Sequence, residues 1–150
     1  MKIPPKPPVG WLIAYEYIWA SSFRDRDEGN KTYPVAIVAA SQDLGPFRVA
    51  YVLAISHSPP KAGDRAIEVP RKLKRHLGLD DEPSWIYTDQ ANVFAWPGPD
   101  LRPADRLSSL PRAAGTCVIG PLPSDWFKVI TAHFEESRRL GLLKLRPRST

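Results

Sequence analysis

The sequence predicts a mainly β domain of the α+β class: six to seven short strands curled into a small barrel, one C-terminal helix and a short helix near residues 70–77. Short apolar runs of strand length recur along the chain, turn residues separate them, and a single long run has helical periodicity. Because strands and helices do not alternate, a doubly wound parallel sheet is not expected.

The first half of the chain contains three predicted strands. Large side chains at alternate positions from Trp11 to Trp19 follow the two-residue period of a strand. The runs Val35–Ala40 and Val49–Ile55 are apolar at successive positions, which predicts central strands covered on both faces. Between the first two strands, the charged segment Ser21–Lys31 is expected to form an exposed loop.

The second half begins with a short strand over Arg65–Val69 and a short helix. Proline suits the first position of a helix and glycine suits its end, so Pro70 and Gly78 bound this helix. Further strands are expected at Trp85–Asp89, Asn92–Trp96 and Cys117–Ile119, with a surface excursion over residues 97–115.

The C-terminal helix has the clearest signal. Ser124 is predicted as its N-cap, Phe127, Ile130 and Phe134 share one face, and Gly141 ends it. The predicted organisation is therefore an extended N-terminal arm (1–9), one barrel domain (10–141) and a basic, frayed C-terminal tail (142–150).

The composition of the chain indicates which binding partners and which cellular compartment to expect. The formal charge is +5 and the pI is about 9.5, which favours a polyanionic partner such as nucleic acid or an acidic protein. Cys117 is the only cysteine, so an intrachain disulfide and a paired-cysteine metal site are excluded. No apolar run reaches the ~20 residues of a membrane span, and the N-terminus lacks a signal-peptide pattern. We expect a cytoplasmic protein with no membrane contact, metal or cofactor.

Three segments carry a family resemblance: Val9–Ile13 followed by Tyr33–Val38, then Leu53–Ser58, then Thr88–Trp96. In this order they resemble the PemK/MazF growth inhibitors, the RNA-cleaving toxins of bacterial toxin–antitoxin pairs. The resemblance covers roughly residues 9–140, with 70–84 and 97–115 as insertions. It implies an SH3-like barrel, a homodimer, single-stranded RNA as substrate and an acidic antitoxin protein that covers the cleft.

The resemblance also implies site residues, at positions that match the family pattern to different degrees. Family members carry an arginine before the proline that opens the second strand, and this chain has Tyr33 there. Where they carry a threonine, Ser56 keeps the hydroxyl, and Asp89 and Gln90 match directly.

Cleavage of RNA without metal needs a base, an acid, and a cation or hydrogen-bond donors for the developing charge. We expect Arg24 or Arg26 to replace the missing cation, Ser56 to donate to a phosphate oxygen, His57 to transfer protons, and Asp89 to act as a base or orienting group. The structural alternatives are a solvated loop with internal ion pairs, a loop-capping Ser–His pair and a turn aspartate bonded to its own backbone.

A second set of residues is expected to contact RNA without taking part in the chemistry. The predicted short helix carries a dense basic stripe that could follow a phosphate backbone, and a solvated helix face is the alternative. The RNA-contacting candidates are Tyr33, Gln90, Arg71, Lys72, Lys74 and Arg75.

The leading hypothesis is therefore a toxin-like, metal-independent endoribonuclease that cleaves single-stranded RNA. Its competitors are a catalytically degenerate barrel that binds RNA or protein, and a toxin of the gyrase-poison type. The nuclease hypothesis requires cations from the segment between the first two strands to meet the Ser56 hydroxyl and the His57 imidazole in a pocket that fits a phosphodiester. Placement of Arg24, Arg26, Ser56 and Asp89 on unrelated surfaces would rule it out.

Overall fold

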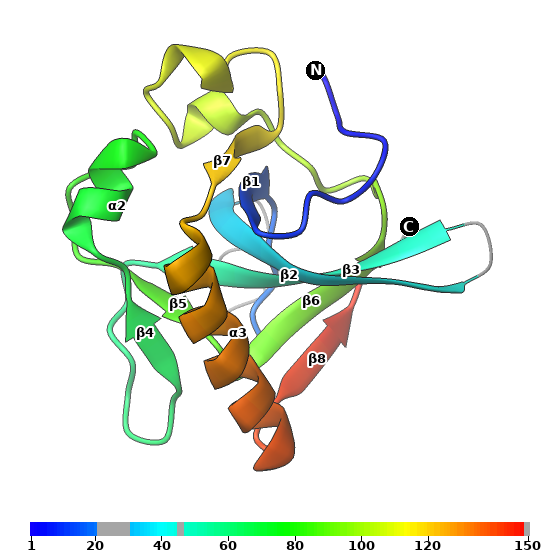
Figure 1. The fold of residues 1–150 in the computed structure, drawn as a ribbon, viewed down its shortest axis with the longest axis vertical. Coiled ribbons are helices and arrows are strands. Elements are labelled where there is room, and N and C mark those ends of the chain that lie inside the picture. Colours follow the sequence, from blue (N-terminus) through cyan, green and yellow to red (C-terminus); the bar gives the residue numbers. More distant parts are fainter. Residues whose placement is uncertain (21–30, 45–46, 149–150) are drawn as a thin grey trace.

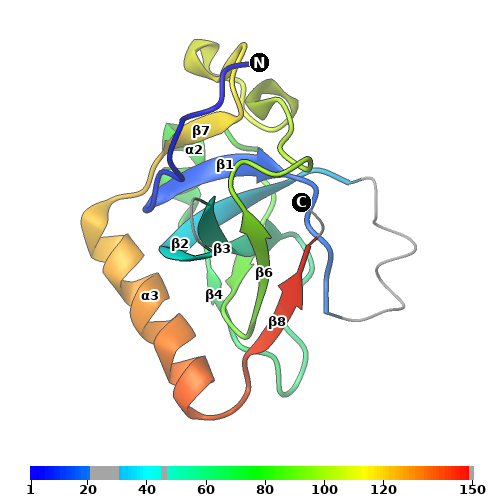
Figure 2. The same ribbon diagram turned by 90° about the vertical axis from the view of Figure 1, so that its right-hand side faces the viewer.

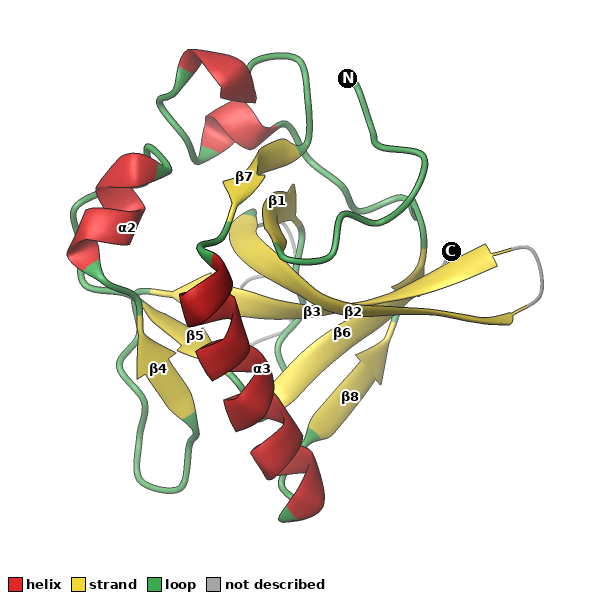
Figure 3. Ribbon diagram, viewed as in Figure 1, coloured by secondary structure: helices red, strands yellow, loops and turns green. Residues whose placement is uncertain are grey.

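The computed structural model describes residues 1–20, 31–44 and 47–148 (Figure 1). In this part of the chain, eight strands dominate and two α-helices cover them (Figure 3). The strands are β1 (Trp11–Tyr15), β2 (Tyr33–Leu44), β3 (Phe47–Ser56), β4 (Ala66–Glu68), β5 (Trp85–Tyr87), β6 (Gln90–Ala95), β7 (Val118–Pro121) and β8 (Lys144–Pro147). The helices are α2 (Arg71–His76) and α3 (Ser124–Arg139), with 3-10 turns η1 (Ala104–Arg106) and η2 (Pro111–Ala113).

The predicted mainly β class is confirmed. Neighbouring strands follow the order β4-β5-β3-β2-β1-β7, and β6 pairs with β3 and with β8. The sheet is curved but not closed, because the path ends at β4 on one side and at β7 on the other (Figure 2). The described strands number eight, one more than the six to seven expected.

The additional strand comes from the segment expected to be a frayed tail. β8 pairs in parallel with β6, with Gln90 opposite Lys144, and the Arg148 N–H continues the ladder by donating to the Val93 carbonyl over 2.8 Å. The Arg148 guanidinium also lies 3.0 Å from the Asp100 carboxylate. The expectation of fraying is therefore wrong for residues 144–148, because the open edge of β6 and a distant carboxylate supply partners that local sequence does not contain.

Burial on both faces of β2 and β3 agrees with the prediction of central strands. One face packs under α3, where Leu12, Leu53 and Ile130 are fully buried. The other face holds an aromatic cluster that includes Tyr15 and Trp19. Packing on both faces fixes the long β2–β3 ladder. Side chains at the ends of this ladder are therefore the ones placed to contact a ligand.

The first strand is shorter than its periodicity predicts. β1 ends at Tyr15, although Tyr17 and Trp19 are still buried. The Asn92 side chain bonds both backbone groups of Ile18, and the Ala20 N–H donates to Gln90 Oε1 over 2.8 Å. The segment keeps its alternating burial because side chains of β6, rather than a neighbouring strand, satisfy its backbone.

Both predicted helices are present. α3 begins at Ser124 with Pro123 in the cap position and no side-chain cap, so the expected serine cap is wrong by one residue. Phe127, Ile130 and Phe134 on its apolar face belong to the core or pack against it, and Figure 2 shows α3 running alongside the strands. In the part of the chain that the structure describes, neither helix is long and apolar enough to cross a membrane.

Candidate functional site

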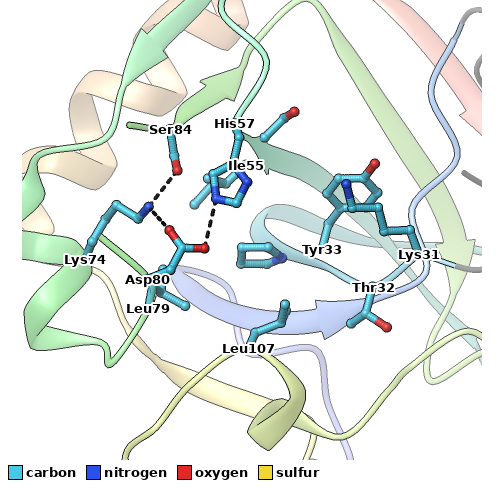
Figure 4. A pocket seen from close by; sticks show the side chains of 12 residues that line it. Lys31, Thr32, Tyr33, Ile55, His57, Lys74, Leu79, Asp80, Ser84 and Leu107 are labelled. Carbon is cyan, nitrogen blue, oxygen red and sulfur yellow. Dashed lines mark hydrogen bonds and ion pairs between the residues drawn. The ribbon is translucent and has the colours of Figure 1, made fainter. Parts of the chain in front are cut away.

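A pocket of about 120 Å³ opens where four segments of the chain meet, one of them contributing Leu107 alone (Figure 4). Antiparallel pairing of β2 with β3, with Val35 opposite Ala54, brings the start of β2 and the end of β3 to the same end of the ladder. The segment between α2 and β5 closes the third side. The pocket is lined by Lys31, Thr32, Tyr33, Pro34, Ile55, Ser56, His57, Lys74, Leu79, Asp80, Ser84 and Leu107.

One side of the pocket is a connected series of polar side chains. His57 Nε2 lies 2.9 Å from Asp80 Oδ2, and the other carboxylate oxygen of Asp80 accepts from Lys74 Nζ over 2.6 Å. Lys74 also donates to Ser84 Oγ over 2.7 Å and to the Glu82 carbonyl. The Lys74 side chain is only 4% exposed, so it can anchor Asp80, and Asp80 can in turn hold the imidazole in one orientation.

The electrostatics keep Asp80 ionised. Partial burial raises the pKa of its carboxyl, but the Lys74 hydrogen bond, the Glu82 backbone N–H and the charges of Lys74 and His57 outweigh burial and lower this pKa below 3.8. A charged Asp80 accepts the Nε2–H of His57. The other ring nitrogen, Nδ1, lies 3.9 Å from a Glu82 carboxylate oxygen, beyond hydrogen-bonding distance.

The same cluster is the candidate metal site in the described part of the chain. His57, Asp80 and Glu82 bring three potential ligand atoms within 4.8 Å of one another. Lys74 already places a positive charge 2.6 Å from the Asp80 carboxylate, and all three potential ligands are exposed. A divalent cation would be repelled by that ammonium, so the cluster is better suited to orienting the imidazole.

The opposite side of the pocket carries the available cations. Lys31 Nζ lies 5.2 Å from the centre of the Tyr33 ring, and Thr32 Oγ1 accepts a hydrogen bond from Arg106 over 3.2 Å. Figure 4 shows Lys31, Thr32 and Tyr33 across the pocket from Asp80 and Lys74. Tyr33, at the position where the resemblance implies arginine, is only 4% exposed. On this side of the pocket, the Thr32 rim, positive charge is therefore supplied by Lys31 and Arg106 rather than by residue 33.

Ser56 both caps a loop and lines the pocket. Its Oγ accepts from the Ser58 N–H over 3.1 Å, and Tyr87 donates to the Ser58 carbonyl over 2.6 Å. These bonds hold the turn that positions His57, and they leave the Ser56 hydroxyl hydrogen available to a ligand. Ser56 and His57, which are adjacent in the sequence, both line the pocket.

Asp89 and Gln90 are not in this pocket. Ser56 pairs with Trp85 at one end of β5, and Asp89 lies four residues farther on, about 13 Å along an extended chain. Asp89 Oδ2 instead accepts from the Arg65 N–H over 3.0 Å, and burial raises the pKa of its carboxyl despite that bond. The expected convergence of Asp89 with Ser56 is wrong, because the β5–β6 turn lies at the other end of β5.

The basic stripe expected on the short helix is interrupted. Arg71, Lys72 and Arg75 of α2 are exposed, but Lys74 is 3% exposed and paired inside the pocket wall, so it cannot follow a phosphate backbone as expected. The expected catalytic residues Arg24 and Arg26 lie outside the described residues.

Three residues of this region were not found from the sequence: Lys31, Asp80 and Arg106. Asp80 lies two residues after Gly78, in a segment that on its own indicates only a turn. Lys31 is the last residue of the charged segment Ser21–Lys31, which contains the expected arginines, and Arg106 lies in the excursion 97–115. Long-range contacts place Lys31 and Asp80 in the pocket lining and bring Arg106 to Thr32 beside it. Comparison of the chain with protein-family models, curated proteins and solved structures finds no match.

Proposed function

We propose that this chain is a metal-independent endoribonuclease that cleaves single-stranded RNA in the pocket of Ser56 and His57. The observation that supports it is the oriented imidazole: His57 is held by Asp80, Asp80 by the buried Lys74, and Lys31 supplies positive charge across the pocket. The resemblance of the sequence to PemK/MazF growth inhibitors points to the same activity.

In the proposed reaction, His57 Nδ1 takes the proton of the ribose 2′-hydroxyl, whose oxygen attacks the adjacent phosphorus. Asp80 stabilises the imidazolium through Nε2–H. Lys31 and the Ser56 hydroxyl stabilise the charge that develops on the phosphate oxygens. The bond to the leaving oxygen breaks and that oxygen takes a proton from water. The hydroxide that remains takes the proton from His57, so the products are a cyclic phosphate and a free hydroxyl and the imidazole is neutral again.

The proposal includes the partners that the resemblance implies. The chain would act in the cytoplasm as a homodimer, and an acidic antitoxin protein would cover the pocket. The formal charge of +5 supports an acidic partner.

The second candidate is a barrel that binds RNA or protein without cutting, and the position of Tyr33 favours it. A buried phenol replaces the guanidinium that the resemblance implies, so the strongest expected electrostatic contribution to catalysis is missing at that position. A toxin of the gyrase-poison type is a variant of this binding function.

Expression in bacteria distinguishes these functions. The nuclease predicts slowed growth and RNA fragments that end in a cyclic phosphate, with both effects abolished by His57→Ala. His76→Ala, which removes an exposed histidine of α2, is the matched control. Slowed growth with intact RNA would support the gyrase-poison type, and unchanged growth would support the binding module.

A further inference from the structure

The charges around the pocket are divided unequally between its two sides. On the His57 side, the ammonium of Lys74 and the carboxylate of Asp80 are 2.6 Å apart and neutralise each other. On the Thr32 side, Lys31 and Arg106 are both exposed. An anion that enters the pocket is therefore attracted toward the Thr32 side rather than toward the buried lysine.

Arg106 reaches this rim from a distant part of the chain. It ends η1, and its Nη1 donates to Thr32 Oγ1 over 3.2 Å, across 74 residues of sequence. Among the described residues, this hydroxyl is the one acceptor that the guanidinium bonds, and a neutral hydroxyl does not compensate its positive charge. The remaining N–H groups suit a phosphate, because a guanidinium offers a planar, two-pronged set of donors.

The surface continues beyond Arg106. A second, open hollow shares Leu79, Asp80 and Leu107 with the pocket and is lined in addition by Asp105, Arg106 and Ser109. The Asp105 carboxylate also lines this hollow and disfavours a phosphate inside it. A bound phosphate is therefore expected beside the first pocket, where Arg106 bonds Thr32.

We propose that Arg106, together with Lys31, binds a backbone phosphate of single-stranded RNA at the Thr32 rim and supplies the positive charge that Tyr33 lacks. This inference rests on the proposed function and adds a substrate-binding residue from the excursion 97–115. Arg106 would position the RNA so that the neighbouring ribose lies against His57. Arg106 would therefore determine how tightly and in which position the RNA binds, because His57 performs the proton transfer.

The test measures binding separately from cleavage. A short, mixed-sequence 2′-O-methyl oligoribonucleotide cannot be cleaved, because its attacking hydroxyl is blocked. Its affinity for the full chain is measured by fluorescence anisotropy over a range of salt concentrations. The variants are Arg106→Gln, Arg106→Lys and Arg139→Gln, the last being an exposed arginine of α3 outside the pocket lining.

The salt slope is the steepness with which the logarithm of the binding constant falls with the logarithm of the salt concentration. We expect Arg106→Gln to lower it by about 0.7, which corresponds to roughly eightfold weaker binding than the wild type near 50 mM salt. Arg106→Lys keeps the slope because the charge is kept, and Arg139→Gln leaves both quantities unchanged. Unchanged melting temperatures check that the variants are folded. Equal slopes for Arg106→Gln and the wild type would overturn the role of Arg106 while RNA cleavage by the wild type still stood. Absence of both binding and cleavage in the wild type would overturn this inference together with the proposed function.

Discussion

His57 Nε2 and Asp80 Oδ2 lie 2.9 Å apart, although 23 residues separate them in the sequence. His57 follows the end of β3 and Asp80 lies in the turn after α2, so neither element alone makes the pair. The buried Lys74 fixes the position of Asp80 by donating a hydrogen bond to its other carboxylate oxygen. An imidazole oriented in this way, beside a hydroxyl and a cation, is the feature on which the proposed chemistry depends.

Asp80→Asn should reduce RNA cleavage about 10- to 100-fold in kcat, with little change in KM. An asparagine can keep an oxygen toward Lys74 but directs an N–H at His57, which moves the ring proton to Nδ1 and removes the base. Single-turnover kinetics on a defined RNA measure the effect. Asp81→Asn, a change of the same kind at the exposed neighbouring residue, is the control. Equal rates for the two variants would show that Asp80 does not orient His57.

Lys74→Ala should destabilise the fold by about 2 kcal/mol, because it removes a buried charged donor with three acceptors and takes from the Ser84 oxygen the donor it accepts from. Lys72→Ala, at the exposed neighbouring position of the same helix, should stay within about 0.5 kcal/mol of wild type. Both values follow from urea unfolding curves, as the difference in midpoint multiplied by the common dependence of the unfolding free energy on urea concentration. If the two variants unfolded at the same urea concentration, Lys74 would be a surface residue as the sequence suggested.

Mild acidification should lower the free energy of unfolding, and His133 is the residue responsible. Burial lowers the pKa of this imidazole, and the charge of Arg65 lowers it further, against smaller opposite effects from Glu136 and Asp89. Above the ordinary value of 6.5, the ring is neutral in the folded and unfolded chains. As the pH falls through 6.5 toward the lower folded pKa, the unfolded chain binds the proton first, so stability is lost.

Thermal melting between about pH 7.5 and 5 tests this linkage. His133→Gln should lose less stability than the wild type over that interval, while His76→Gln, at an exposed position on α2, should follow the wild-type curve. A His133→Gln curve parallel to the wild type would show that His133 is not held neutral by the fold.

The regular elements could be predicted because their signals are local. Two-sided apolar runs identify β2 and β3, and the spacing of Phe127, Ile130 and Phe134 identifies α3. The placement of Ser56 and His57 beside the segment before Pro34 also follows from antiparallel pairing of consecutive strands. These statements depend on neighbours in sequence or on adjacent strands.

What the sequence could not provide depends on distant contacts. Lys74 looks like one of four basic residues on a short helix, and only the turn that carries Asp80 and Ser84 reveals that it is buried. Asp89 resembles a site residue, but its position is decided by the direction of β5 rather than by its motif. The C-terminal residues look frayed because basic composition says nothing about the open edge of β6 that β8 covers.

The central claim is that His57 transfers a proton during cleavage of RNA. Purified chain is incubated with single-stranded RNA in the presence of a chelator, and the new ends are identified by mass spectrometry. We expect cyclic phosphate ends with the wild type and with His76→Gln, and uncut RNA with His57→Gln. Uncut RNA with the wild type, or cleavage by His57→Gln at the wild-type rate, would contradict this claim.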